Sequence, residues 1–119
     1  HAPLIRDTVG LIGARELGLL PAGAVVINTA RGELVDEEAL IAALDSGRLA
    51  GAALDVIHGE PTGHAAPDTP LLRAARRRDN LLVTPHIGGA TWESMEKTEL
   101  FIADRLRDFF AAQAREVRA

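Results

Sequence analysis

The chain has 119 residues, which is enough for one domain or for part of one. Its formal net charge of −4 is mild, and no apolar run reaches the roughly 18 residues that a membrane span needs. The chain contains no cysteine, so no disulfide can form, which fits a reducing compartment. These features predict a globular cytoplasmic protein with neither a nucleic acid nor a membrane as its partner.

Segments with helix and strand patterns alternate along the chain. A short helix is expected at residues 13–20, and the apolar run at 23–28 is typical of a strand buried on both faces. Asp36 is suited to cap a second helix, which Gly47 ends. The buried stripe of this second helix is predicted to consist of Ala39, Leu40, Ala43 and Leu44.

The second half of the chain continues this alternation. Small and aliphatic residues at 49–56 predict a strand, and a Gly/Pro-rich loop at 58–70 follows it. A short helix at about 71–77 precedes a strand at 81–83. The last helix is expected from a cap at Thr91 to about residue 114, with an apolar side formed by Met95, Ile102, Leu106, Phe109 and Phe110.

One basic cluster stands out in the sequence. It consists of Arg73, Arg76, Arg77 and Arg78. No aromatic side chain is interleaved with these arginines. Positively charged side chains at the C-terminal end of a short helix interact favourably with the helix dipole. We therefore interpret the cluster as a solvated helix end and not as a nucleic-acid interface.

The alternation of strands and helices with short connections predicts an α/β fold with a parallel sheet. Ligands of such sheets bind beyond the carboxyl ends of the strands. The residues that follow the three predicted strands should therefore meet at one edge. Four of them have side chains that can bind a charged group or transfer a proton, namely Arg31, Asp55, Glu60 and His86.

These four side chains suit a site for a carboxylate that lies beside a carbonyl or hydroxyl group. Arg31 offers a planar fork for a carboxylate, and His86 belongs to the residue type that exchanges protons near neutral pH. Glu60 could hold one tautomer of the imidazole. Singly, each has a structural explanation, such as a surface cation, a loop carboxylate or, for Asp55, a turn cap. Their convergence favours the site.

Three motifs then resemble the D-isomer-specific 2-hydroxyacid dehydrogenases. They are residues 26–36 (VINTARGELVD), residues 51–56 (GAALDV) with Glu60 and Pro61, and residues 84–91 (TPHIGGAT). They occur in the order and at the spacing of that family, and the resemblance covers nearly the whole chain. The TPHIGGAT form is most similar to the phosphoglycerate dehydrogenase branch, although glyoxylate and hydroxypyruvate reductases have close variants.

The resemblance implies a role for each site residue. Arg31 would bind the substrate, Glu60 would orient the histidine, and His86 would be the acid–base. Ala2 and Pro3 would flank the ribose and phosphates of the cofactor. The cofactor-binding set implied by the family is Thr29, Ala30, Arg31, Asp55, His86, Gly88 and Gly89, with the Asp55 carboxylate accepting from the nicotinamide carboxamide.

The resemblance also implies how the chain is organised. Residues 1–90 would be the second half of a dinucleotide-binding domain, the C-terminal half of a Rossmann-like parallel sheet, and residues 91–119 a long C-terminal helix that returns to a substrate domain. A Gly-x-Gly-x-x-Gly loop is missing, since Gly10-Leu11-Ile12-Gly13 has the wrong spacing and no strand before it. In the family that loop precedes the position of His1.

The predicted function is therefore hydride transfer between NAD and a small D-2-hydroxy acid or 2-keto acid, with NADP left open. The intact protein would be a homodimer, and this chain alone would be inactive. A non-catalytic protein that senses NADH on the same scaffold is the alternative. His58 and His64 beside Glu60 could suggest a metal, but no third ligand has suitable spacing, so no metal is expected.

Overall fold

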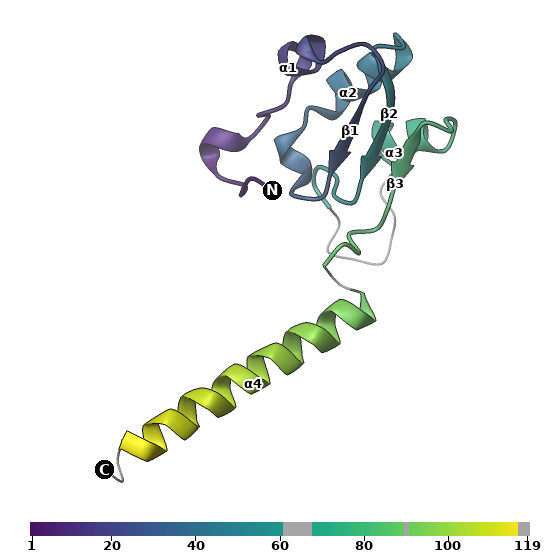
Figure 1. Ribbon diagram of the computed structural model, residues 1–119. Coiled ribbons are helices and arrows are strands. Elements are labelled where there is room, and N and C mark those ends of the chain that lie inside the picture. Colours follow the sequence, from purple (N-terminus) through teal and green to yellow (C-terminus); the bar gives the residue numbers. More distant parts are fainter. Residues whose placement is uncertain (61–67, 90, 117–119) are drawn as a thin grey trace. The chain divides into compact units, whose positions relative to one another are not determined.

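The computed structural model describes residues 1–60, 68–89 and 91–116, with the side chains of residues 112–116 left aside. The chain divides into two compact units, His1–His86 and Ile87–Ala119. The first unit holds an α/β fold and the second a single long helix (Figure 1). Within the described ranges, no helix combines the length and the apolar character needed to cross a bilayer.

A three-stranded parallel sheet forms the centre of the first unit. Its strands, in spatial order, are β1 (Ala24–Asn28), β2 (Leu49–Leu54) and β3 (Leu81–Val83). Leu54 pairs with Asn28 on one side and with Val83 on the other. Both neighbours of β2 end at that level, so β2 stops two residues before the end of the predicted 49–56 strand. The predicted parallel sheet is confirmed.

The helices of this unit are short, and the second and third begin at side-chain caps. They are α1 (Ala14–Leu19), α2 (Glu37–Asp45) and α3 (Pro70–Ala75), with 3₁₀ turns η1 (Arg6–Thr8) and η2 (Gly32–Leu34). The Asp36 carboxylate accepts the Ala39 amide at 3.0 Å, which confirms the predicted cap. The third helix ends before the predicted Arg77, because the Arg77 amide donates to Ala74 and tightens the chain into a turn.

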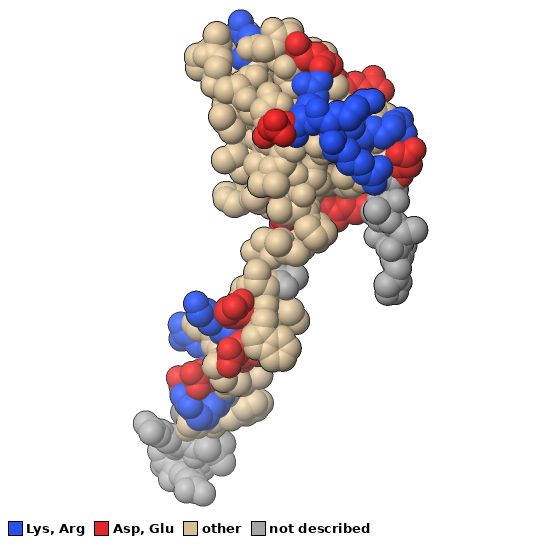
Figure 2. Space-filling view, turned by 90° about the vertical axis from the view of Figure 1, so that its right-hand side faces the viewer, with Lys and Arg blue, Asp and Glu red and all other residues tan. Residues whose placement is uncertain are grey.

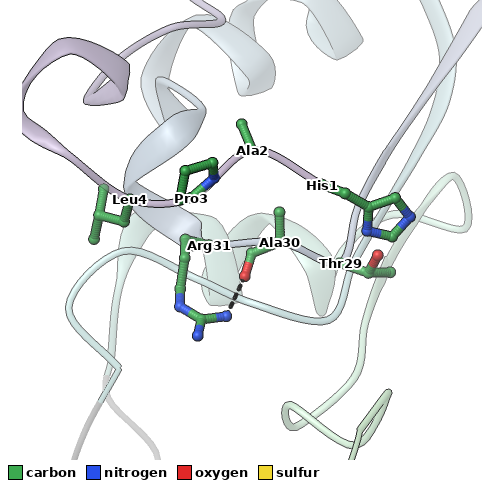
Figure 3. A pocket seen from close by; sticks show the side chains of 7 residues that line it. All are labelled: His1, Ala2, Pro3, Leu4, Thr29, Ala30 and Arg31. Carbon is green, nitrogen blue, oxygen red and sulfur yellow. Dashed lines mark hydrogen bonds between the residues drawn. The ribbon is translucent and has the colours of Figure 1, made fainter.

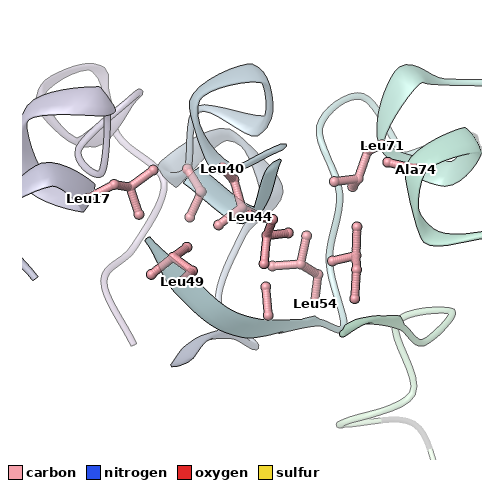
Figure 4. Packing of buried hydrophobic residues seen from close by; sticks show 10 residues of the cluster. Leu17, Leu40, Leu44, Leu49, Leu54, Leu71 and Ala74 are labelled. Atoms are coloured by element: carbon pink, nitrogen blue, oxygen red, sulfur yellow. The ribbon is translucent and has the colours of Figure 1, made fainter. Parts of the chain in front are cut away.

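The core lies between these helices and one face of the sheet (Figure 4). Leu40 and Leu44 of the predicted α2 stripe are buried, and Leu40 and Leu71 are fully inaccessible to solvent. The buried cluster consists of Leu17, Val35, Leu40, Leu44, Leu49, Ala52, Leu54, Leu71, Ala74 and Leu81. Burial of this aliphatic surface is the main force that holds the sheet and helices together.

The prediction that the first strand is buried on both faces is wrong. Along β1, Ala24 and Val26 pack against the core, whereas Val25 and Ile27 are 59% and 71% exposed. Leu82 of β3 is likewise 61% exposed. The helices of this unit pack against only one face of the sheet, so within the unit alternate side chains of the outer strands are left on an open apolar face.

The arginines at the end of α3 lie next to acidic side chains. Figure 2 shows a group of basic side chains bordered by acidic ones. Arg73 is 2.9 Å from Asp68, with Arg76 at 4.0 Å from the same residue, and Arg78 pairs with Asp45. Most of these side chains are exposed, so each pair contributes only a few tenths of a kcal/mol, up to about 1 kcal/mol.

The second unit consists mainly of α4 (Trp92–Glu116). The Ser94 amide donates to the Thr91 hydroxyl at 3.2 Å, so the helix begins at the predicted cap. The predicted apolar side of the helix is exposed, each residue by half or more, at Met95, Ile102, Leu106, Phe109 and Phe110. A helix with such a side is amphipathic, and none of the described side chains of its own unit covers that side.

Glu16 gives the first helix a stability that depends on pH. Its carboxylate accepts the Gly13 amide at 3.1 Å, and hydrogen bonds from the amides of Glu16 and Gly13 lower the pKa of the carboxyl below its ordinary 4.5. Because the folded state favours the ionised carboxylate, Glu16 stabilises the fold above pH 4.5, and this contribution disappears as the pH falls through the lowered pKa.

We expect Glu16→Ala to unfold at a lower urea concentration than the parent at pH 7, and the difference between the two urea midpoints to be smaller at pH 3. An equal gap at both pH values would refute this account.

Candidate active site

The turn after β1 is held by a buried asparagine. The Asn28 side chain donates to the Arg31 carbonyl at 2.8 Å and accepts the Ala30 amide at 3.0 Å. These two bonds fix the path of the chain from the strand to Arg31. Asn28 was not among the predicted site residues, although an asparagine at the end of an apolar strand is a recognised signal for such a turn.

A cavity of about 540 Å³ lies beside this turn (Figure 3). Its lining residues come from the N-terminal segment and from the chain after β1, and they are His1, Ala2, Pro3, Leu4, Thr29, Ala30 and Arg31. The volume suits a small molecule or one part of a larger ligand. The cavity therefore lies where the family resemblance predicts cofactor contacts from Ala2, Pro3, Thr29 and Ala30.

Arg31 is exposed, and its guanidinium folds back onto the preceding residue. Nη1 donates to the Ala30 carbonyl at 2.6 Å (Figure 3). Within the described part of the chain, the arginine makes neither a hydrogen bond nor an ion pair with Glu60 or His86. The structure therefore does not join the predicted substrate-binding arginine to the other two predicted catalytic residues.

Glu60 and His86, in contrast, are in direct contact. Glu60 Oε2 lies 2.6 Å from His86 Nδ1, and Glu60 Oε1 accepts the Ile57 amide at 3.0 Å. With the carboxylate ionised, the proton of a neutral imidazole lies on Nδ1, which leaves Nε2 for exchange with a ligand. The pair is partly exposed, with 33% of the Glu60 side chain and 47% of the His86 side chain accessible.

His86 has an unusual backbone conformation. Its φ is +53°, the only positive value among the described residues other than glycine. Its amide donates to the Thr84 carbonyl at 3.0 Å, across Pro85. The left-handed region costs a residue with a Cβ about 1–2 kcal/mol, and such strain is found preferentially at functional sites.

A second hydrogen bond joins the ends of β2 and β3. The Thr84 hydroxyl donates to Asp55 Oδ1 at 2.5 Å, and Asp55 is only 8% exposed. The two residues follow the paired Leu54 and Val83, so the strand register brings them together. Asp55 was predicted as a site residue but Thr84 was not, because the register of the strands cannot be read from the sequence.

Three of the residues considered from the sequence do not belong to the described part of the first unit. Gly88 and Gly89 belong to the second unit, whereas the residues of the site belong to the first. His64 lies outside the described residues.

Comparison with known proteins assigns the chain to a family. Residues 1–88 match the model described as "D-isomer specific 2-hydroxyacid dehydrogenase, NAD binding domain". The chain belongs to this dehydrogenase family. D-3-phosphoglycerate dehydrogenase of Escherichia coli K12 is 44% identical over 107 residues, which are 89% of this chain and 25% of the relative. The curated relatives compared are covered over only 18% to 36% of their length.

Solved dehydrogenase structures share the fold. The NAD complex of a D-isomer specific 2-hydroxyacid dehydrogenase from Lactobacillus delbrueckii ssp. bulgaricus gives a TM-score of 0.75 at 35% identity, covering 89% of this chain and 34% of that chain. A 2-hydroxyacid dehydrogenase from Xanthobacter autotrophicus Py2, in complex with NADPH and MES, gives 0.61 at 50% identity, covering 72% and 25%. The predicted Rossmann-like fold, the dehydrogenase family and NAD as the cofactor of the family are confirmed.

Proposed function

We propose that the full-length gene product is an NAD(P)-dependent D-2-hydroxyacid dehydrogenase that interconverts a small 2-keto acid and its D-2-hydroxy acid. The observation that carries this proposal is the contact of Glu60 with His86 at the carboxyl edge of a parallel sheet. A carboxylate on Nδ1 of a histidine whose other nitrogen is available is the arrangement that general acid–base catalysis needs.

His86 is the residue to which we assign the proton transfer. In the direction of reduction, Nε2 donates its proton to the carbonyl oxygen of the substrate, and in the direction of oxidation it removes the proton of the hydroxyl group. Glu60 stabilises the imidazolium form through Nδ1. The nicotinamide cofactor, when bound, would supply or accept the hydride at C2 of the substrate, the carbon that carries the keto or hydroxyl group. Protons and electrons then balance as keto acid, NADH and H⁺ against hydroxy acid and NAD⁺.

Arg31 and Asp55 are assigned to binding. The Arg31 guanidinium is exposed and bonded to a single backbone carbonyl, so donors remain for the carboxylate of a substrate. The buried Asp55 carboxylate is fixed by the Thr84 hydroxyl and would accept a hydrogen bond from the carboxamide of the nicotinamide. The cavity beside Thr29 and Ala30 is large enough for part of the cofactor.

The relatives suggest which substrates and which assembly to test. Curated relatives bear the names D-3-phosphoglycerate dehydrogenase and glycerate dehydrogenase, and we propose phosphoglycerate-like, glyoxylate-like or hydroxypyruvate-like substrates. We further propose a cytoplasmic homodimer. The exposed apolar side of α4 would pack on a substrate domain, residues 1–90 would belong to the dinucleotide-binding domain, and the 119 residues alone would be inactive.

An assay of the full-length gene product tests this function. It would be mixed with NADH or NADPH and a panel of 2-keto acids, and oxidation of the cofactor would be followed at 340 nm. We expect turnover on at least one acid. Fluorescence enhancement of NADH without turnover on any acid would overturn the proposal and favour the protein that senses NADH.

A further inference from the structure

The loop 57–60, which carries Glu60, has an unusual set of backbone contacts. Three successive amides of the loop each donate to a carboxylate. Ile57 donates to Glu60 at 3.0 Å, His58 donates to Glu37 at 2.7 Å, and Gly59 donates to Glu33 at 3.4 Å. A run of amides that face carboxylates is an anion-binding arrangement, here occupied by the protein's own side chains.

Two of these carboxylates come from a distant part of the sequence. Glu33 lies in η2 and Glu37 in the first turn of α2, and both are partly buried. The stronger contact is that of Glu37, because charge-assisted bonds from N–H to a carboxylate are short, near the observed 2.7 Å. The carboxylates of Glu33 and Glu37 thus hold loop 57–60 by its backbone amides.

The position of the loop decides where the Glu60 carboxylate lies. Its Oε1 is bound to the Ile57 amide of the same loop, and its Oε2 faces His86 Nδ1. Since both side chains of the pair are partly exposed, water competes for these bonds, and a loop free to move would separate them. Catalytic geometry tolerates little such displacement.

We propose that Glu37 is a positioning residue for the catalytic pair, acting through the His58 amide on Glu60 and hence on His86. The inference rests on the proposed function for its kinetic test, although the contact itself does not. Glu38 provides a matched control. It is the next residue of the same helix turn, is exposed, and its side chain has no hydrogen bond or ion pair with the described residues.

The kinetic test compares three variants of the full-length gene product. We expect Glu37→Ala to lower kcat on the order of 10-fold while the KM for NADH changes little, because the cavity residues are not touched. Glu37→Gln should recover most of kcat, since an amide oxygen can accept the His58 N–H. Glu38→Ala should match the parent. Retention of kcat in Glu37→Ala would overturn the proposal, as would failure of the Gln variant in a protein with unchanged thermal unfolding.

A second readout needs no turnover and separates this inference from the proposed function. The ¹⁵N shifts of the His86 ring report which nitrogen carries the proton. We expect the Nδ1–H form to dominate in the parent and in Glu37→Gln, and a mixture of tautomers in Glu37→Ala. If the parent lacks dehydrogenase activity but shows this pattern, the proposed function fails and the positioning role stands. An unchanged pattern in Glu37→Ala would refute the positioning role.

Discussion

Replacement of His86 by asparagine is expected to lower kcat of the full-length gene product at least about 100-fold. Asparagine cannot exchange a proton at neutral pH, so the variant would have no general acid to protonate the carbonyl oxygen of the substrate. Among residues without that ability, asparagine is chosen because it tolerates the positive φ of +53° observed at this position. The kcat for 2-keto acid reduction and the urea midpoint would be measured on the same preparation.

A second variant separates the chemistry from the backbone. His86→Ala should lose as much activity as His86→Asn, but it should also be less stable than the asparagine variant by about 1 kcal/mol, because alanine disfavours the left-handed region. If the less stable His86→Ala variant also had the lower kcat of the two, the loss of activity would be attributed to the damaged structure. Turnover that survives in His86→Asn would remove His86 from the mechanism.

Replacement of Gly32 by alanine should destabilise the chain by about 3 kcal/mol, the upper end of the usual range for an overpacked site. A Cβ at this buried position would come closer than 3.0 Å to backbone atoms of Ile57 and His58. Backbone atoms cannot rotate away as a flexible side chain can, so loop 57–60 would have to move. Because that loop carries Glu60, we expect a loss of activity together with the loss of stability.

Gly18 provides the matched control for this substitution. It lies in α1, and a Cβ there would meet nothing within 4 Å. Gly18→Ala is therefore expected to stabilise the chain, by roughly 0.5–1 kcal/mol, because alanine is favoured over glycine in a helix. Urea unfolding followed by circular dichroism would measure both variants. Equal midpoints for Gly32→Ala and the parent would show that the loop accommodates the methyl group without cost.

The parts of the fold that could be predicted depend on local signals. The caps at Asp36 and Thr91 are visible because a capping side chain bonds to amides a few residues away. The proximity of Glu60 and His86 followed from a topological rule, since parallel strands place their carboxyl ends at one edge. In these cases a short sequence pattern, or the order of strands and helices along the chain, is enough to predict the contact.

The remaining features depend on contacts between distant segments. The bond from His58 to Glu37 joins a backbone amide to a side chain 21 residues away, and no sequence pattern marks such a pair. Hydrophobic periodicity likewise reports that Val25 and Ile27 are apolar, but not whether anything covers them. The orientation of Arg31 toward Ala30 is also a property of the folded turn.

The open apolar face of the sheet has a consequence for the colloidal behaviour of the chain. Val25 and Ile27 lie on β1, which is also an edge of the described sheet, and such an edge is a template for pairing with other molecules. Electrostatic repulsion between molecules opposes that pairing. With a pI near 5.5, this repulsion vanishes in mildly acidic buffer and grows above neutrality. Alkaline buffer and dilute samples are therefore the conditions that favour monodisperse preparations.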